Sequence, residues 1–250
     1  MKDNSYNKDT EQKHFDLLAK AEGEIWWGSA TEAGIKRLER RAFLVKNALS
    51  ELPDPKVLEI GCGTGAFSKH ILNAVPELHL TACDISPECV KKASERYSSY
   101  SKAKFILGDA TYNLCDPSSF DAVIGNAVLH HLPLNNSLME CFKALKPGGR
   151  ILFFEPNMMN PQIFIEKNIK FIGKALQNTE TETAFLRWRL KKDLSQIGFV
   201  RISVKPFDFL HPLIPGYGIS LFDALGKILE RIPILREFSG SLIISAFKPR

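Results

Sequence analysis

A short apolar run that ends in three closely spaced glycines is the feature of this sequence that most constrains its fold. Val57–Ile60 reads as a buried strand, the glycines Gly61, Gly63 and Gly65 follow it, and a helical pattern begins near Ala66. Glycines in such a turn let the backbone approach a ligand because no Cβ atom stands in the way. The pattern predicts an α/β unit with a ligand on the turn. The spacing alone also suits a dinucleotide, with its pyrophosphate at the helix N-terminus.

Six further apolar runs read as strands, with helical patterns between most of them. The runs are Leu78–Cys83, Lys104–Leu107, Asp121–Gly125, Arg150–Phe154, Gly198–Phe209 and Ser241–Lys248. Strands that alternate with helices indicate βαβ units and a parallel sheet. We therefore expect an α/β fold in which helices cover both faces of one sheet.

The N-terminal part of the chain has helical patterns and no strand pattern. These patterns cover residues 11–21 and 31–50, and prolines follow them at positions 53 and 55. We expect residues 1–55 to form a helical cap and residues 56–250 to form the main domain.

Composition excludes several classes of protein. Of the 250 residues, 44% are hydrophobic and 24% are charged, as in ordinary globular proteins, which excludes a largely disordered or fibrous chain. No run approaches the roughly 18 uncharged apolar residues of a membrane-spanning helix, and the polar start lacks a signal-peptide core. The five cysteines include no CxxC pair. We expect reduced thiols and a cytoplasmic protein.

Three acidic residues and two longer segments accompany the glycine turn in a fixed order. Glu59 lies two residues before the first glycine, Asp84 ends the second predicted strand, and Asp109 follows the third. The segments Phe120–Pro133 and Ala144–Leu152 then surround the fourth and fifth strands. Together they resemble the class I S-adenosylmethionine (SAM)-dependent methyltransferases, over roughly Lys56 to Glu155. The resemblance implies a Rossmann-like, seven-stranded, mostly parallel sheet whose last two strands form an antiparallel hairpin.

The same resemblance implies a cofactor, SAM, a product, S-adenosylhomocysteine, and a set of contacts. Asp84 is expected at the ribose hydroxyls, Asp109 at the adenine amino group, and the Asn126 backbone carbonyl near the methionine moiety. Glu59 is expected beside the sulfonium and ammonium groups, where a buried carboxylate is favourable. The residues expected to contact the cofactor are Glu59, Gly61, Cys62, Gly63, Asp84, Ile85, Asp109, Ala110 and Asn126.

Each acidic residue also has a purely structural interpretation. Asp84 and Asp109 are suited to capping the helices that follow them, and Glu59 is suited to a role in the fold alone. Adjacent parallel strands nevertheless end in the crevice where open α/β sheets bind ligands. That position favours the cofactor role for Asp84 and Asp109.

Methyl transfer from a sulfonium mainly requires alignment of the acceptor, and a base is needed only when the acceptor has to lose a proton. His130 and His131 lie just after the fourth strand, and Glu155 ends the fifth. Histidine titrates near neutral pH, so His130, His131 and Glu155 are the candidate catalytic residues. The alternative is that the two histidines only shape the pocket. We predict no metal site.

The acceptor is less well defined. The sequence has no Asn/Asp-Pro-Pro-Tyr segment after the fourth strand, no cysteine pair of the RNA cytosine methyltransferase kind, and no recognisable nucleic-acid module. A small-molecule or lipid-like acceptor is therefore favoured and nucleic acid is not expected. The oligomeric state is left open.

Two other classes of function remain. One is a protein that binds SAM without transferring the methyl group. The other is a NAD-dependent oxidoreductase, which offers no reason for Glu59 or Asp109.

Two amphipathic helices are predicted in insertions near residues 157–185 and 210–240. The helix at 160–177 places Ile165, Ile169, Ile172 and Leu176 on one stripe, and the helix at 217–232 does the same with Leu221, Leu225, Ile228 and Ile232. Residues 161–250 also carry 14 Lys and Arg against 8 Asp and Glu. The stripes either pack on the core of the protein or contact an anionic membrane surface or a prenyl-like substrate. The membrane interpretation predicts a protein that is peripheral at the membrane, through Lys167, Lys170, Lys174, Lys227 and Arg231.

Two smaller groups of residues complete the prediction. Trp26 and Trp27, between the N-terminal helices, either close over the cofactor or pack against the core. One of Arg37, Arg40 and Arg41 is expected to hold the methionine carboxylate.

Overall fold

A single seven-stranded sheet organises the computed structural model, which describes residues 6–21, 28–169 and 182–250. The strand order is β3-β2-β1-β4-β5-β7-β6. The strands are β1 (Lys56–Ile60), β2 (His79–Asp84), β3 (Ala103–Leu107), β4 (Phe120–Asn126), β5 (Leu145–Pro156), β6 (Val200–Phe207) and β7 (Ser241–Phe247). Strands β1 to β5 pair in parallel, whereas β7 pairs antiparallel with both β5 and β6. The predicted sheet and its closing hairpin are confirmed.

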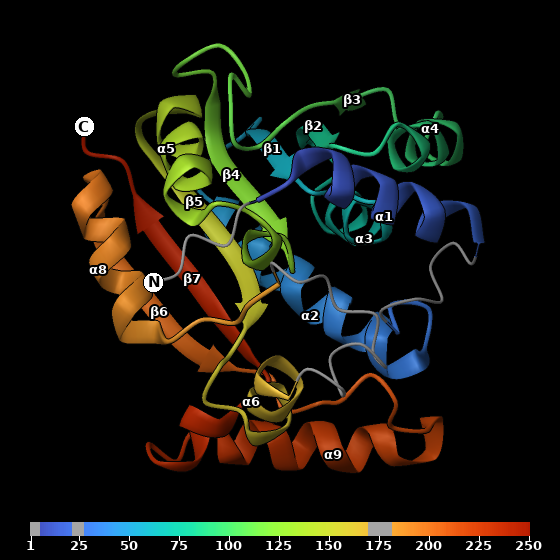
Figure 1. Cartoon of the computed structure of the whole chain (residues 1–250), viewed down its shortest axis with the longest axis vertical. Coiled ribbons are helices and arrows are strands. Elements are labelled where there is room, and N and C mark those ends of the chain that lie inside the picture. The colour runs from blue at the N-terminus through green and yellow to red at the C-terminus, as the bar shows by residue number, and fades with distance from the viewer. Residues whose placement is uncertain (1–5, 22–27, 170–181) are drawn as a thin grey trace.

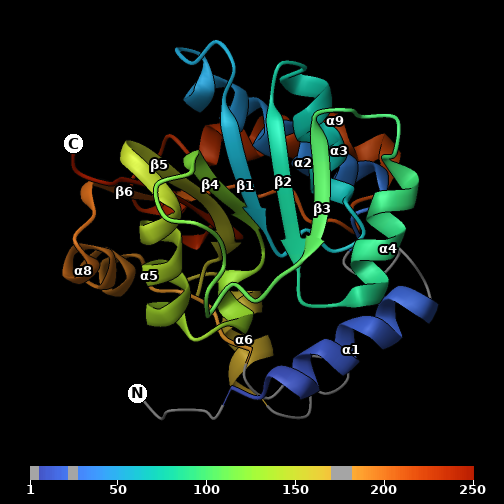
Figure 2. The ribbon, with the colours of Figure 1, turned by 90° about the horizontal axis from the view of Figure 1, so that it is seen from above.

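Helices lie on both faces of this sheet (Figures 1 and 2). They are α1 (Lys8–Ala21), α2 (Glu32–Leu49), α3 (Ala66–Ala74), α4 (Pro87–Arg96), α5 (Leu134–Ala144), α6 (Pro161–Asn168), α8 (Arg187–Ile197) and α9 (Gly216–Leu229). Short 3₁₀ turns occur at Leu129–His131 and Leu235–Phe238. Local signals set several helix starts: the Thr31 hydroxyl accepts a hydrogen bond from the Gly34 amide, and the Ser86 hydroxyl accepts one from the Cys89 amide.

Two hydrophobic cores hold the layers together. On one face, α2 and α3 pack on the sheet through side chains that include Val45 and Ile71. On the other face, α5 and α8 do so through side chains that include Leu138 and Leu190. Because α2 shares a core with the sheet, it is fixed relative to the carboxyl ends of the strands. The boundary of the cap at residue 55 stays a prediction.

Helix α1 lies across the edge of the sheet where the parallel strands end (Figure 2). Its Lys8 ammonium lies 3.1 Å from the Asp109 carboxylate, after β3. Asp16 accepts a hydrogen bond from the Ser86 hydroxyl at the start of α4, and Lys92 of α4 donates to the Ala19 carbonyl. These contacts from α1 cover one side of the crevice above the strand ends.

The insertion helices differ from the expectation in two ways. Helix α6 ends at Asn168, because Ile169 has extended backbone angles, and positions 170–181 lie outside the described residues, with Lys170, Ile172, Lys174 and Leu176 among them. The stripe residues Ile165 and Ile169 are exposed, as is the stripe of α9. In the described residues the stripes therefore do not pack on the core. Trp26 and Trp27 also lie outside the described residues.

None of the helices in the described parts of the chain is both long enough and apolar enough to span a membrane.

Candidate active site

The turn after β1 has the conformation that its glycines predict. Gly61, Gly63 and Gly65 all have positive φ angles, of 65°, 53° and 85°. A Cβ atom on Gly61 would clash with Val128, whereas a Cβ atom on Gly63 would meet nothing within 4 Å. Gly63 therefore faces open space, and the backbone there is accessible to a ligand.

Asp84, at the end of β2, is tied to this turn. One of its carboxylate oxygens accepts a hydrogen bond from the Gly63 amide at 2.8 Å, and the other accepts one from the Ser86 amide at 2.9 Å. Burial raises the pKa of Asp84, although these backbone amides oppose the rise. Each oxygen keeps a further lone pair, so the carboxylate is able to accept hydroxyl groups of a ligand.

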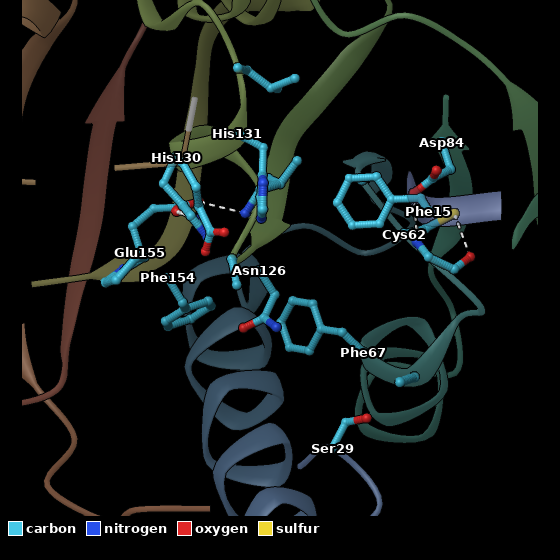
Figure 3. Close-up of a pocket in the computed structure, with 18 of the residues that line it drawn as sticks. Phe15, Ser29, Cys62, Phe67, Asp84, Asn126, His130, His131, Phe154 and Glu155 are labelled. Atoms are coloured by element: carbon cyan, nitrogen blue, oxygen red, sulfur yellow. Dashed lines mark hydrogen bonds and ion pairs between the residues drawn. The ribbon is translucent and has the colours of Figure 1, made fainter. Parts of the chain in front are cut away.

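A cavity of about 410 Å³ lies beside the turn, at the carboxyl ends of the parallel strands. Predicted site residues that line it are Gly61, Cys62, Gly63, Asp84, Ile85, Ala110, Asn126, His130, His131 and Glu155. Figure 3 shows Cys62 and Asp84 on one side and His130, His131 and Glu155 on the other. Residues that end or follow five different strands thus meet at one site.

Two of the predicted cofactor residues are absent from this lining. Glu59 is buried below the turn, where it accepts a hydrogen bond from the Ser68 hydroxyl at 2.6 Å, and burial raises its pKa to about 8. Asp109 lines a neighbouring depression with Lys8 and Ile85. Burial opposes ionisation of Asp109, but hydrogen bonds from Thr111 and Lys8 outweigh it and lower its pKa. The cofactor contacts expected for Glu59 and Asp109 stay predictions.

Cys62 lines the cavity, but it is not an activated nucleophile. Burial raises the pKa of its thiol well above the ordinary value, and the nearby Asp84 adds to this effect. The thiolate is the reactive form of cysteine. Cys62 therefore contributes a neutral surface to the cavity.

A hydrogen-bonded pair forms the opposite wall. His130 Nδ1 lies 2.8 Å from Glu155 Oε2, and both side chains are buried. The other oxygen of Glu155 accepts hydrogen bonds from the Val128 and Leu129 amides, at 3.0 and 2.9 Å. Two backbone amides thus fix the carboxylate, and the carboxylate fixes the ring of His130. In the neutral ring, with the Nδ1 proton donated to Glu155, the lone pair is on Nε2; in the charged ring, Nε2 also carries a proton, which faces Glu182.

Charged residues from α6 and from the segment before α8 complete this wall. Glu182 Oε1 lies 3.5 Å from His130 Nε2 and 2.5 Å from the Lys167 ammonium. Burial lowers the pKa of His130, but the hydrogen bonds to Glu155 and Glu182 outweigh it and the net pKa is raised. Burial also opposes ionisation of Glu182, yet its pKa is lowered because His130, His131 and Lys167 surround it.

His131 has a different environment from its neighbour. Its ring centroid lies 4.1 Å from that of His130, and its Nδ1 lies 3.7 Å from Glu11 of α1. Burial and the adjacent His130 hold the pKa of His131 well below its ordinary value. His131 is therefore neutral at physiological pH. The two histidines are not equivalent, and His130 has the Glu155 carboxylate at hydrogen-bond distance.

The histidines and Glu182 also have the composition of a metal site, because their ligand atoms lie within 4.8 Å of one another. The Lys167 ammonium already lies against the Glu182 carboxylate. This internal cation balances the charge that a metal ion would otherwise balance, and we assign no metal to the cluster.

Of the three arginines considered, two reach the cavity. Arg37 and Arg41 line it, whereas Arg40 forms a bidentate ion pair with Glu230, just after α9. Arg41 is buried and donates hydrogen bonds to Asn126 Oδ1 and Asp208 Oδ2. Burial and the neighbouring Arg37 lower the pKa of Arg41 to about 10, so it remains charged at neutral pH.

Several residues of the site have no signal in the sequence. They are Tyr6, Glu11 and Phe15 from the α1 region, Lys167 from α6, Glu182 and Asp208. Each reaches the site through a contact between segments far apart in the chain. Local pattern and spacing do not report such contacts.

Over part of its length, the chain is similar to known methyltransferases. The family model described as a methyltransferase domain matches residues 57–149. Malonyl-[acyl-carrier protein] O-methyltransferase of Paenibacillus sp. (strain JDR-2) is 31% identical over 136 residues, which cover 52% of this chain and 48% of that protein. The chain thus spans about half the length of this curated relative.

Solved structures share the fold. The CurJ carbon methyltransferase superposes with a TM-score of 0.63 at 18% identity, over 88% of this chain and 56% of that one. N-methyltransferase NodS from Bradyrhizobium japonicum WM9, in complex with S-adenosylhomocysteine, superposes with a TM-score of 0.62 at 16% identity, over 95% and 100% of the two chains. At these identities the likeness concerns the fold.

Proposed function

We propose that the chain is a class I, Rossmann-like SAM-dependent methyltransferase and that it transfers a methyl group from SAM to a small-molecule or lipid-like acceptor. The observation that carries the proposal is the juxtaposition of two walls in one cavity. One wall holds the glycine turn and Asp84, and the other holds the His130–Glu155 pair. The first wall suits a cofactor and the second suits proton transfer.

The residues present fit SAM as the methyl donor. The open space at Gly63 admits a ligand against the backbone, and Asp84 offers carboxylate oxygens at the same point. Arg37 and Arg41 place positive charge at the cavity, where a carboxylate of the ligand is suited to bind. SAM, when bound, supplies an activated methyl group on a positively charged sulfur.

The other wall indicates what kind of acceptor reacts. His130 takes a proton at Nε2, while Glu155 keeps the ring oriented and stabilises the imidazolium that forms. Such a pair is useful for an acceptor whose C–H or O–H group has to lose a proton, and it brings no advantage to a carboxylate that is already ionised. We therefore favour an acceptor with an acidic C–H or O–H group.

The names of the similar proteins divide between two kinds of acceptor. Several relatives are named for O-methylation of malonyl-[acyl-carrier protein], where the acceptor oxygen belongs to a carboxylate that needs no base, and several others are polyketide synthases. The His130–Glu155 pair favours the second kind, in which a C–H group has to lose a proton. A carbon methyltransferase is among the similar structures. We accordingly place acyl compounds with an acidic C–H group first among the acceptors to test.

The alternative of a SAM-binding protein without transferase activity is tested by the same experiment. The chain is incubated with SAM that carries a deuterated methyl group and with a fractionated metabolite and lipid extract, and products are read by mass spectrometry. Transfer predicts a labelled product, which the His130→Ala variant forms about 10²–10⁴-fold more slowly. If no fraction is labelled while S-adenosylhomocysteine binds tightly, the chain binds the cofactor without transferring the methyl group and the proposal is wrong.

A further inference from the structure

Helix α9 turns its small residues towards the protein and its large apolar residues away from it. Its buried residues are Gly218 and Gly226. By contrast, Tyr217 is 94% exposed, Leu221 61% and Ile228 55%. An amphipathic helix on a protein surface normally buries its apolar stripe. The orientation of α9 is the reverse of that arrangement.

The contacts of α9 explain how this orientation is held. Arg40 of α2 forms its bidentate ion pair with Glu230 just after α9, and a Cβ atom on Gly226 would lie 3.2 Å from Phe209 Cβ. The Glu230 carboxylate also accepts a hydrogen bond from the Asp208 amide. The helix is thus anchored by its polar end and its glycines. Its apolar stripe is not used for packing.

The exposed apolar surface extends beyond the helix along the chain. Leu213 before α9 and Ile234 after it are each 75% exposed. Further exposed side chains of the same segment are Phe222, Leu225, Ile232, Leu235 and Phe238. Monomeric soluble proteins rarely expose large contiguous apolar patches without a use for them. We call this segment, residues 213–238, the apolar segment.

The charges of the apolar segment favour an anionic partner. Each of its three acidic residues lies against a cation: Asp223 against Lys227 at 2.7 Å, Glu230 against Arg40, and Glu237 against Arg187 at 2.8 Å. Arg231, at the end of α9, is exposed. The acidic groups are therefore neutralised within the protein. An exposed cation remains beside the apolar stripe.

We propose that the apolar segment binds the surface of an anionic phospholipid membrane, with α9 lying flat in the headgroup region. At 14 residues α9 is about 21 Å long, which is too short to cross a bilayer but sufficient to lie in its interface. Leu221, Leu225 and Ile228 enter the apolar boundary, and Tyr217 lies at the polar level, where tyrosine is favoured. Arg231 pairs with lipid phosphates.

Among the predicted cations that the structure describes, fewer are available to lipid than the sequence predicts. The Lys167 side chain is 8% exposed and is held by Glu182 inside the cavity wall, so it is not available to lipid. Lys227 is shared with Asp223. The apolar side chains therefore provide most of the binding, and the cations add a preference for anionic lipid. The proposal does not depend on methyl transfer, because no residue of the apolar segment belongs to the His130 wall.

The test is co-sedimentation of the whole chain with vesicles of phosphatidylcholine alone and of phosphatidylcholine with an equal share of phosphatidylglycerol. We expect binding to the anionic vesicles that weakens as salt is raised beyond about 0.1 M, where the Debye length falls to about 10 Å or less. Leu221→Gln should weaken binding about tenfold, as loss of one apolar side chain from the interface requires. Arg231→Gln should weaken binding to anionic vesicles about fivefold and leave binding to neutral vesicles unchanged.

Leu17→Gln is the matched control, because Leu17 on α1 is also a leucine and is 68% exposed. It should bind vesicles as the wild-type chain does. Equal loss of binding in both leucine variants, or no binding to anionic vesicles at low salt, would overturn the proposal. Light scattering adds a second readout: a dimer that Leu221→Gln converts to a monomer, with no vesicle binding, would show that a second copy covers this face. Unchanged affinity for S-adenosylhomocysteine in every variant separates this result from the proposed function.

Discussion

His130 and Glu155 meet across the ends of two neighbouring parallel strands, with His130 Nδ1 2.8 Å from Glu155 Oε2. The backbone fixes the position of this pair. The Val128 and Leu129 amides donate hydrogen bonds to the other oxygen of the Glu155 carboxylate. The pair faces a cavity whose opposite wall is the glycine turn. The following predictions test each wall separately.

Removal of the base should slow methyl transfer and leave cofactor binding intact. We expect His130→Ala to lower turnover by about 10²–10⁴-fold, the usual contribution of a positioned general base, with little change in the affinity for S-adenosylhomocysteine. His79→Ala, which removes an exposed histidine that pairs with Asp54, is the control and should leave turnover unchanged. If the turnover of His130→Ala is within threefold of that of the wild type, His130 is not a general base, and alignment of the acceptor is the mechanism that remains.

The pH dependence of the reaction should report the environment of His130. The active form is the neutral imidazole, and the neighbouring carboxylates favour the charged form and raise its pKa above the ordinary value of 6.5. We therefore expect kcat/KM to increase with pH and to reach its plateau above that value. Glu155→Gln removes one of the charges that raise the pKa of His130, so the midpoint should move to lower pH as the maximal rate falls. A midpoint that stays in place would show that Glu155 does not act on His130.

The cofactor wall should respond to loss of Asp84. A carboxylate that accepts hydroxyl groups contributes roughly 1.5–3 kcal/mol through charge-assisted hydrogen bonds, so Asp84→Ala should weaken S-adenosylhomocysteine binding by roughly 10–150-fold in calorimetry. Asp54→Ala is a suitable control because Asp54 is exposed and does not line the cavity. Equal affinities of Asp84→Ala and wild type would remove Asp84 from the site.

Glu59 should make the stability of the ligand-free chain depend on pH. Burial raises its pKa from 4.5 to about 8 in the folded state. The unfolded chain thus releases the proton near pH 4.5 while the folded chain retains it, and stability is lost as pH rises from the lower pKa towards the higher. Between pH 5 and pH 8 the free energy of unfolding should fall by roughly 3–4 kcal/mol relative to Glu59→Gln. Chemical denaturation at the two pH values measures the difference.

Glu77→Gln, at an exposed position near the start of β2, is the control for that experiment. It should follow the wild-type dependence on pH. A Glu59→Gln variant that also follows the wild type would show that Glu59 is ionised in the folded chain.

The parts of this molecule that are predictable from sequence are those set by neighbours along the chain. The strand from Lys56 to Ile60, the turn at Gly61 and the helix from Ala66 follow from local apolar pattern and from the positive φ that glycine tolerates. His130 and Glu155 were predicted to lie near one site because both follow neighbouring parallel strands. Their direct hydrogen bond was not predicted, since it depends on the turn at Val128.

The parts that sequence does not predict depend on long-range contacts. Arg41 lies off the apolar stripe of α2, yet it is buried. Its charge is balanced by an ion pair with Asp208, which lies 167 positions away in the sequence. The sequence pattern predicts that Lys167 faces solvent from an amphipathic helix. In the structure its ammonium forms an ion pair with Glu182 in the cavity wall. Periodicity likewise predicts that α9 has an apolar stripe. It does not predict which side of the helix meets the protein.

Thermal unfolding with each of two ligands is the most direct test of the central claim, that the cavity at the glycine turn binds SAM. A ligand at 100 times its dissociation constant stabilises the folded chain by about 2.7 kcal/mol, which is a readily measured increase in Tm. We predict this increase with S-adenosylhomocysteine for the wild-type chain, a smaller one for Asp84→Ala at the same concentration, and none with NAD. An increase with NAD and none with S-adenosylhomocysteine would contradict the account.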